Sequence, residues 1–300
     1  MKVAVTGSSG LIGKALIELL EASEHEVIRI IRDQSKLDSN TRYWNPATGD
    51  IDTTAFDEAD AVVHLAGANI GERRWSDNRK RELRESRVTA TELLVEAMHA
   101  VHNPPAVLVA GSAVGYYGNR GDEVLSEDSE AGKGFLADLT VDWEAATNTA
   151  EHEGTRVVLA RTGLVVSGNA PFLTKMLKPF KLGLGGPLGD GTQWWSWIDI
   201  EDEVRALAFL LTSNLSGPVN LCSPNPVTNR EFTRTLASVL KRPALLPVPR
   251  FGPRLLLGAE LADELLFCST KAMPNVLCNA GFKFEHDNLQ ATLQRALVSA

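Results

Sequence analysis

Cysteine is scarce in this sequence of 300 residues, where it occurs only as Cys222, Cys268 and Cys278. Three widely spaced thiols form neither the even-numbered framework of a disulfide-stapled domain nor the Cys-x-x-Cys pair of a common metal site. We therefore expect no metal centre, and a protein that resides in the reducing cytoplasm.

The chain also lacks an excess of positive charge and a long apolar run. Its formal net charge is −8, whereas a protein that binds nucleic acid or an anionic membrane over a broad surface needs a basic face. No apolar stretch reaches the roughly 20 residues of a membrane span. We expect neither a nucleic-acid nor a membrane partner, and any phosphate-bearing ligand has to be held by local groups.

The most informative stretch is the start of the chain. A β-branched and apolar run, residues 1–6, leads directly into Gly7, Gly10 and Gly13, and a helical pattern continues to about Ala22. In a strand–turn–helix unit, one glycine permits the tight turn, one lets the backbone approach a pyrophosphate, and one lets helix and strand pack closely. The helix N-terminus then offers free N–H groups and a positive dipole end to the phosphates. This stretch predicts a dinucleotide-binding site.

The end of the next expected strand, residues 26–31, indicates which dinucleotide is bound. In such folds an acidic side chain about 20 residues beyond the glycines binds the adenosine ribose, while an arginine there accepts a 2′-phosphate. Arg32 comes first here and Asp33 second. Because a guanidinium matches phosphate oxygens and a carboxylate repels them, we favour NADP(H) over NAD. The alternative is that Arg32 caps the strand edge and Asp33 binds the ribose.

Strands and helices alternate through the first half of the chain. Further apolar strands are expected at 60–67, 106–112 and 155–161, with helices at 72–100 and 134–151 between them. This alternation predicts an α/β fold with a Rossmann-type, doubly wound parallel sheet. We expect a dinucleotide-binding domain at 1–165 and a smaller α/β lobe at 166–300.

The expected C-terminal lobe is richer in turns and tryptophan. Residues 194–199 form a short aromatic strand with Trp195 and Trp197 on one face, either lining a substrate pocket or packing between the lobes. The remaining expected elements are helices at 201–211, 229–240 and 288–298 and strands at 219–221 and 244–248.

Two strand ends carry polar side chains that have catalytic potential. His64 lies within an apolar strand, where a lone histidine is more often a hydrogen-bonded core residue than a base, and we expect the former. Ser112 ends a central strand and is followed by Tyr116 and Tyr117 on a glycine-rich loop. Open α/β sheets bind their ligands at this edge.

These motifs resemble those of the short-chain dehydrogenase/reductase superfamily, in its extended, epimerase-like branch. The similar segments are Thr6-Gly7-Ser8-Ser9-Gly10-Leu11-Ile12-Gly13, His64-Leu65-Ala66-Gly67, Arg87-Val88-Thr89-Ala90-Thr91, Gly111-Ser112 and Trp197-Ile198-Asp199. Arg73-Arg74-Trp75, residues 112–118 and 182–187, and Ala280-Gly281-Phe282 narrow the resemblance to the atypical epimerase family of the bacterial YfcH type. That family ends in a DUF1731 segment, expected here at about 249–296.

The resemblance implies NADP(H) binding and a set of contact residues. It places Gly7, Gly10 and Gly13 on the pyrophosphate, Arg32 on the adenosine ribose, and Arg87 where the extended branch usually keeps an asparagine. The full expected cofactor-binding set is Gly7, Ser9, Gly10, Leu11, Ile12, Gly13, Arg32, Leu65, Ala66, Gly67, Glu82, Arg87, Gly111 and Val165.

The catalytic pair of this superfamily is missing. Its working members place Tyr-x-x-x-Lys on one helical face, so that the ammonium group lowers the tyrosine pKa. The only tyrosines are Tyr43, Tyr116 and Tyr117, none followed by lysine at that spacing, and residues 135–140 contain neither tyrosine nor lysine. Without a nearby cation a phenol has a pKa of about 10 and is a poor base, although it can still donate a proton.

Two functional hypotheses remain open. In the first, Ser112 with Tyr116 or Tyr117 polarises a small carbonyl or hydroxyl substrate during hydride exchange with NADP(H), in an oxidoreductase or an epimerase. In the second, the protein binds NADP(H) without turnover and acts as a sensor or regulator. A homodimer is possible on either hypothesis, although the sequence identifies no interface.

Overall fold

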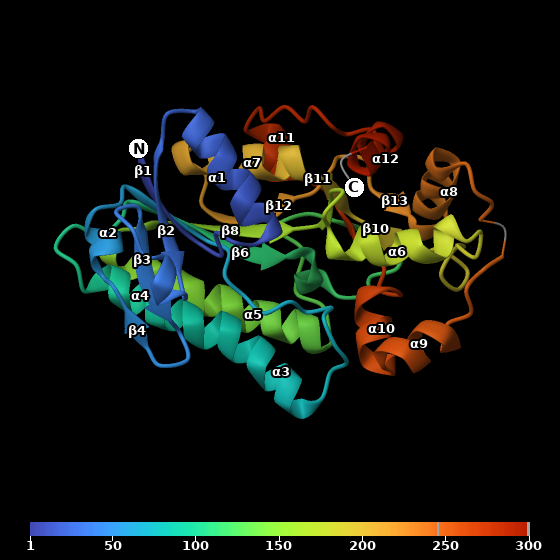
Figure 1. The fold of residues 1–300 in the computed structure, drawn as a ribbon, viewed down its shortest axis with the longest axis horizontal. Coiled ribbons are helices and arrows are strands. Elements are labelled where there is room, and N and C mark those ends of the chain that lie inside the picture. Colours follow the sequence, from blue (N-terminus) through green and yellow to red (C-terminus); the bar gives the residue numbers. More distant parts are fainter. Residues whose placement is uncertain (245, 299–300) are drawn as a thin grey trace.

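The computed structural model describes residues 1–244 and 246–298 and is built around one eight-stranded sheet (Figure 1). In sheet order the strands are β12 (Gly217–Leu221), β8 (Arg156–Thr162), β6 (Val107–Ala113), β5 (Ala61–His64), β1 (Lys2–Thr6), β2 (Glu26–Ile31), β3 (Thr41–Asn45) and β4 (Asp50–Ile51). Only β3 and β4 pair antiparallel. The strand order reverses between β1 and β5, which is where such sheets bind ligands. The predicted doubly wound sheet is therefore confirmed.

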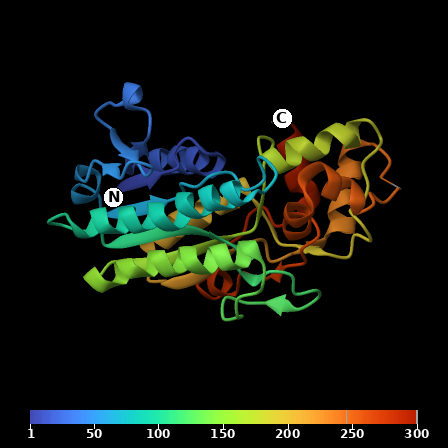
Figure 2. The same ribbon diagram turned by 90° about the horizontal axis from the view of Figure 1, so that it is seen from below.

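Helices cover both faces of this sheet (Figures 1 and 2). On one face lie α1 (Leu11–Ala22) and α7 (Ile200–Thr212), and on the other lie α2 (Thr54–Asp57), α4 (Ala90–His99) and α5 (Phe135–Asn148). Each face of the sheet has its own apolar core, and alternate side chains of β1 pack into one or the other. Val3 and Val5 belong to the first core and Ala4 to the second. Because both faces are covered, the central strands are apolar along most of their length.

The C-terminal lobe has a separate core beside the sheet (Figure 2). It is built from α6 (Pro171–Lys181), α8 (Asn229–Leu240) and α12 (Leu289–Val298) around the short strands β9 (Leu164–Val166), β10 (Trp194–Trp195), β11 (Trp197–Asp199) and β13 (Val227–Thr228). The lobe also contains α9 (Phe251–Leu257), α10 (Ala259–Leu265) and the strand pair β7 (Val124–Leu125) and β14 (Lys271–Ala272), whereas Leu277 of α11 (Asn275–Asn279) belongs to the first core of the central sheet. Trp195 and Trp197 are both buried in this core, which favours packing over lining a pocket.

Several elements differ from the sequence-based expectation. The strand expected at 219–221 does not belong to the C-terminal lobe, because β12 is the edge strand of the central sheet and pairs with β8. The helix expected from residue 72 begins at Asp77 as α3 (Asp77–Arg84) and passes through a π-helical turn, η2 (Glu85–Thr89), into α4.

Two further elements were expected differently or missed. β3 and β4 were not predicted, since residues 41–51 are rich in turn formers and polar groups. The segment 244–248 forms no strand in its described residues, and only Val248 makes a bridge, to Leu188. Residue 245, within that expected strand, lies outside the described residues.

Among the described residues, no helix is both long and apolar enough to cross a bilayer.

Candidate functional site: a dinucleotide crevice

The glycine turn between β1 and α1 has no room for side chains. Gly7 has a φ of +67°, and a Cβ atom there would lie 2.7 Å from the carbonyl carbon of Leu65. A Cβ atom on Gly13 would lie 2.3 Å from the carbonyl oxygen of Gly7, which also accepts a 2.9 Å hydrogen bond from the Gly10 N–H. The turn therefore holds α1 against the ends of β1 and β5, as the three predicted glycine roles require.

The first turn of α1 is left open for an anion. Gly10 is the N-cap residue, no side chain caps the helix, and its first turn contains no acidic residue. The first backbone N–H groups of any helix lack partners within the helix. Ser9 and Gly10 are exposed, while Leu11 and Ile12 are half-buried. This helix end has the geometry and the polarity to bind phosphate.

A buried hydrogen-bond chain fixes the end of β5 beside the glycine turn. The Thr6 hydroxyl accepts from the backbone N–H groups of Leu65 and Ala66, so its own proton is donated to His64 Nδ1 at 2.7 Å. His64 Nε2 then donates to the Thr91 hydroxyl at 3.1 Å. Burial, followed by the charge of Arg87, lowers the pKa of His64 to about 4. His64 is thus a neutral core residue, as expected.

Arg32 lies at the end of β2, the strand next to the glycine turn, and is exposed. Within the described part of the chain it makes no ion pair. Asp33 is already engaged, because its carboxylate accepts from the backbone and hydroxyl of Ser35 and pairs with Lys36 at 3.1 Å. These bonds form the cap of a short 3₁₀ helix, η1 (Gln34–Lys36), and lower the pKa of Asp33. Arg32, rather than Asp33, is therefore the side chain that remains available to a ligand.

Arg87 is a buried cation that has no carboxylate partner among the described residues. It is 8% exposed, and its guanidinium lies against Gly67, where a Cβ atom would be 3.3 Å from Cζ, and over the ring of Trp143 at 5.2 Å. Its Nη1 makes only long contacts, 3.4 Å to the Leu83 carbonyl and 3.5 Å to the Ser86 hydroxyl, and its Nε has no partner. Burial, and then the charge of Arg79, lower the pKa of Arg87 to about 10.

The π-helical turn η2 sets this position. Such turns insert one extra residue into a helix and are frequent at functional sites. Glu82, expected as a weaker cofactor contact, lies in the preceding helix and is already paired with Arg79 at 2.6 Å and with Arg73 at 2.5 Å. The sequence indicated Arg87 only through the family resemblance, because neither its burial nor the π turn follows from the helical pattern.

Ser112 belongs to a buried ionic network instead of an open site. Its hydroxyl donates to Glu144 Oε1 at 2.5 Å, and both oxygens of Glu144 accept from Arg161 at 2.8 Å. Ser112, Glu144 and Arg161 are each 6% exposed or less. Sequence reasoning missed the last two, although an arginine within an apolar strand and a glutamate on a buried helix face are signals of a buried ion pair.

Tyr117 is held in the same network. Its hydroxyl accepts from Arg161 at 3.0 Å and donates to Asn220 at 2.7 Å, and burial raises its pKa to about 12. Tyr116 is half-buried, and its ring lies 3.5 Å from Arg161 Cζ. No hydrogen bond of the Tyr116 hydroxyl is present among the described residues. Of the three expected catalytic residues, only Tyr116 therefore keeps a free hydroxyl.

The remaining expected contacts are distributed around the crevice. Gly111 is buried within β6, where a Cβ atom would lie 3.4 Å from the ring of Trp143, so its absence of a side chain serves packing. Val165 is half-buried on β9 and pairs with Ile198. α5 carries neither tyrosine nor lysine.

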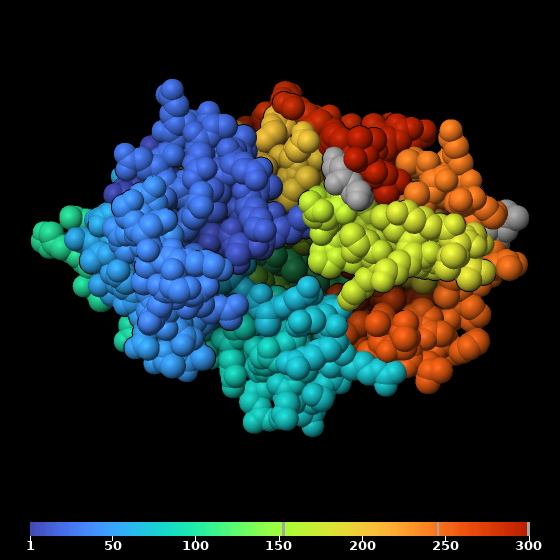
Figure 3. Space-filling model, in the orientation of Figure 1, coloured from blue at the N-terminus to red at the C-terminus, as the bar shows by residue number. Residues whose placement is uncertain are grey.

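The C-terminal lobe closes one side of the crevice. Lys175 of α6 donates to the Gly71 carbonyl at 2.8 Å, and Lys80 of α3 pairs with Glu260 of α10 at 2.5 Å. Glu264 of α10 accepts from the backbone of Phe135 and Leu136 and so caps α5. The space-filling view shows the surface hollowed where the blue, cyan and yellow-green segments meet (Figure 3).

One cluster of metal-ligand type occurs in the described residues. Asp199, Glu201 and His286 bring potential ligand atoms within 4.8 Å of one another. Arg295 binds both Asp199 and His286, so a guanidinium already supplies the positive charge of this cluster.

Comparisons with known proteins agree with this geometry. The model of the "NAD dependent epimerase/dehydratase family" matches residues 3–222, and the domain of unknown function DUF1731 matches residues 248–296. An epimerase family protein of Mycobacterium bovis is 49% identical over 97% of this chain and 96% of its own length. The chloroplastic SDR39U1 homolog of Arabidopsis thaliana is 36% identical over 98% of this chain and 87% of its own length.

A solved structure gives the same fold with a ligand. The human epimerase family protein SDR39U1, crystallised with NADPH, superposes with a TM-score of 0.90 at 33% identity, and the match covers 100% of both chains. The chain thus belongs to the NAD-dependent epimerase/dehydratase family, in the group whose members continue into a DUF1731 segment.

Proposed function

We propose that this protein binds NADP(H) in the crevice at the ends of β1, β2 and β5 and exchanges hydride with a small carbonyl or hydroxyl compound. The observation that supports the cofactor is a pair of cations, Arg32 and Arg87, that make no ion pair in the part of the chain that the structure describes and lie beside a turn that excludes side chains. A 2′-phosphorylated dinucleotide supplies the negative charge that both lack. The NADPH in the human relative supports the same cofactor.

Different groups of the crevice bind different parts of the cofactor. Backbone N–H groups of the turn and of the first turn of α1 hold the pyrophosphate, and Arg32 holds the 2′-phosphate. Leu65 and Ala66, fixed by Thr6, border the adenosine side. We assign Arg87, which lies against Gly67 at the end of β5, to the negatively charged phosphate part of the cofactor, and Val165 to the nicotinamide half, where the bound cofactor would supply the hydride chemistry.

Tyr116 is the group that we assign to proton transfer. Its hydroxyl has no hydrogen-bond partner within residues 1–244 and 246–298, whereas those of Ser112 and Tyr117 are bonded to Glu144 and Asn220. The Arg161 guanidinium against its ring is a fixed cation near the phenol, in a chain that lacks the usual lysine. Tyr116 then acts as a proton donor to a substrate oxygen, a role that a phenol fills without ionising beforehand.

A second function, NADP(H) sensing without turnover, is favoured by a different observation. The two hydroxyls that the sequence offered for catalysis, on Ser112 and Tyr117, are buried and fully bonded to structural partners. A protein that only senses the level of NADP(H) needs neither hydroxyl for catalysis.

The test is a turnover screen on purified protein. NADPH is mixed with a library of small aldehydes and ketones, and the loss of nicotinamide absorbance is followed. We expect substrate-dependent oxidation that falls at least about tenfold in Tyr116→Phe, the scale of a lost acid catalyst. Tyr43→Phe, a phenol on β3, is the matched control and should keep the wild-type rate.

The outcomes separate the two functions. Intact NADPH binding by calorimetry with no oxidation of the cofactor by any compound would favour the sensor. Turnover that Tyr116→Phe leaves unchanged would remove Tyr116 from the mechanism while retaining the enzyme.

A further inference from the structure

The outer end of the C-terminal lobe carries an unusual set of exposed apolar side chains. Six leucine and phenylalanine side chains there are between 71% and 79% exposed: Leu182, Leu184, Leu246, Phe251, Leu255 and Leu256. Among the other large apolar residues described, only Val298, near the C-terminus, is exposed to that degree. Large apolar groups gathered on one surface indicate an interaction site.

These side chains belong to segments that run side by side. The loop after α6 lies along the segment after α8, since the Val248 N–H donates to the Pro187 carbonyl and the Gly189 N–H to the Val248 carbonyl. That second segment leads directly into α9, where Phe251 and Leu255 are one turn apart. Figure 1 places α6, α8 and α9 at the same end of the molecule.

The same segments are strongly basic in an acidic protein. Residues 171–191 and 228–257 contain nine lysines and arginines against Asp190 and Glu231, although the whole chain has a net charge of −8. Five of these cations are exposed and make no ion pair in the described structure: Lys178, Lys181, Arg234, Lys241 and Arg242. We call residues 171–191, 228–244 and 246–257 the basic apolar end.

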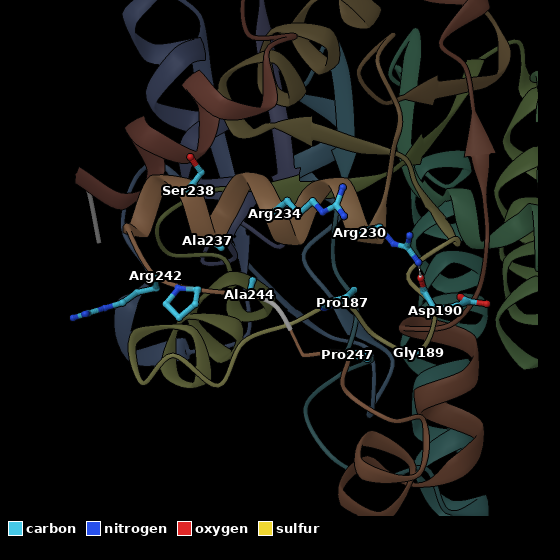
Figure 4. A pocket seen from close by; sticks show the side chains of 11 residues that line it. Pro187, Gly189, Asp190, Arg230, Arg234, Ala237, Ser238, Arg242, Ala244 and Pro247 are labelled. Atoms are coloured by element: carbon cyan, nitrogen blue, oxygen red, sulfur yellow. Dashed lines mark hydrogen bonds between the residues drawn. The ribbon is translucent and has the colours of Figure 1, made fainter.

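A pocket of about 540 Å³ lies within this surface (Figure 4). Arg230 and Arg234 on α8 and Arg242 just beyond its end line it, together with Pro187, Pro247 and other small apolar residues. Its single carboxylate, Asp190, is bonded to the backbone and hydroxyl of Thr192, and its backbone carbonyl accepts from Arg230. The pocket therefore offers cationic groups with an apolar floor.

We propose that the basic apolar end docks on an anionic lipid surface, with lipid phosphates at the arginines and the leucine and phenylalanine side chains among the acyl chains. Basic residues near a membrane are attracted to anionic lipids, and adjacent apolar side chains then enter the interface. This proposal departs from our expectation of no membrane partner, which was based on the net charge of −8. Electrostatic interactions are screened beyond about 10 Å, so the local charge of this surface decides the attraction.

Two other occupants fit this surface less well, one because of charge and one because of its apolar side chains. A second copy of the chain joined by a two-fold axis would place the same basic surface against itself, which is repulsive. Nucleic acid would satisfy the arginines, but five of the six exposed apolar side chains are leucines, which cannot stack on bases as aromatic side chains do.

The test is co-sedimentation of the full chain with vesicles of phosphatidylcholine alone or mixed with phosphatidylglycerol, at low and at high salt. We expect binding to the mixed vesicles only, lost at high salt because the attraction is screened. The double variant Arg234→Glu/Arg242→Glu and the double variant Phe251→Ser/Leu255→Ser should each lower vesicle binding at least about tenfold. Their NADPH affinity should remain that of the wild type, which shows that the fold is intact.

The matched controls make the same kinds of substitution at other positions on the surface. Arg81→Glu/Lys283→Glu makes the same charge change outside the basic apolar end, and Val124→Ser removes an exposed apolar side chain of β7; both should bind as the wild type does. Absence of binding to the mixed vesicles at low salt overturns the proposal. So does a concentration-dependent dimer in sedimentation that Phe251→Ser/Leu255→Ser abolishes, since the face would then belong to a second copy.

Discussion

At the scale of single residues, the crevice is distinguished by charges left without partners. Arg79 and Arg161 are buried, and each has at least one carboxylate within 3.0 Å. Arg87 is comparably buried, but neither it nor Arg32 at the end of β2 has a carboxylate partner among the residues that the structure describes. Burying an unpaired cation costs stability. Such a residue is explained when a ligand brings the opposite charge.

Arg32→Ala tests which ligand that is. A charge-assisted hydrogen bond contributes about 1.5 to 3 kcal/mol, so we expect NADPH affinity to fall roughly ten- to a hundredfold while NADH affinity changes little. Titration calorimetry with both cofactors measures this. Asp33→Ala is the comparison, and it should leave the preference for NADPH in place because that carboxylate caps η1. Equal weakening toward both cofactors would contradict the assignment.

Residue roles were predictable where they depend on neighbours in sequence. The position of Arg32 at a strand end was predictable because it directly follows an apolar run, and the core role of His64 because an apolar strand surrounds it; the contact of Arg32 with the cofactor stays a prediction. The commitment of Ser112 to Glu144, 32 residues away, and of Tyr117 to Asn220, 103 residues away, could not be seen in the sequence. Tertiary partners decide whether a hydroxyl is free to react.

At the scale of elements, the strand–turn–helix unit of β1 and α1 is the least tolerant part of the site. A Cβ atom on Gly13 would meet the carbonyl oxygen of Gly7, which is backbone and cannot rotate away.

Gly13→Ala should therefore push α1 off the turn. We expect a loss of about 1–3 kcal/mol in the free energy of unfolding, the usual cost of overpacking, together with loss of NADPH binding. Urea unfolding and calorimetry measure the two effects. Gly252→Ala is the matched control in a helix where the new Cβ atom meets nothing within 4 Å; it should leave NADPH binding unchanged and should not lower the free energy of unfolding. Retained NADPH binding in Gly13→Ala would show that the turn is not the pyrophosphate site.

Elements with a strong local pattern were predicted well. The bounds expected for α1, β2 and α8 agree with the structure, since apolar periodicity and flanking turn residues define them. The π turn η2 was missed because a single inserted residue leaves the apolar pattern nearly unchanged. β12 was predicted as a strand but assigned to the wrong lobe, because its pairing with β8 is a long-range contact.

At the scale of the whole molecule, one buried carboxyl couples folding to pH. Glu203 of α7 is fully buried; its Oε1 accepts from the Thr162 hydroxyl at 2.8 Å, and its Oε2 has no partner. Burial, only partly offset by that hydrogen bond, raises the pKa of Glu203 from 4.5 to about 8. The folded protein therefore holds a proton that the unfolded chain releases.

The sign of the pH dependence follows from this shift. The contribution of Glu203 to stability is fully present below about pH 4.5 and declines as the pH rises, by on the order of 1.4 kcal/mol per pH unit, until about pH 8. Glu203→Gln should abolish that decline, so that its stability relative to wild type increases from pH 5 to pH 8 in urea unfolding. Glu123→Gln, at an exposed site, is the control. Parallel pH profiles for Glu203→Gln and wild type would contradict the protonated state.

The cap on α5 joins the segment that matches the epimerase/dehydratase family to the segment that matches DUF1731. The two residues of this contact are synthesised at different times. The carboxylate of Glu264 is added to the growing chain 129 residues after Phe135, whose N–H it accepts. At a typical rate of elongation that interval is on the order of ten seconds. The nascent nucleotide-binding half therefore leaves the ribosome before the N-terminus of α5 has its carboxylate cap. The last fifth of the protein supplies that cap.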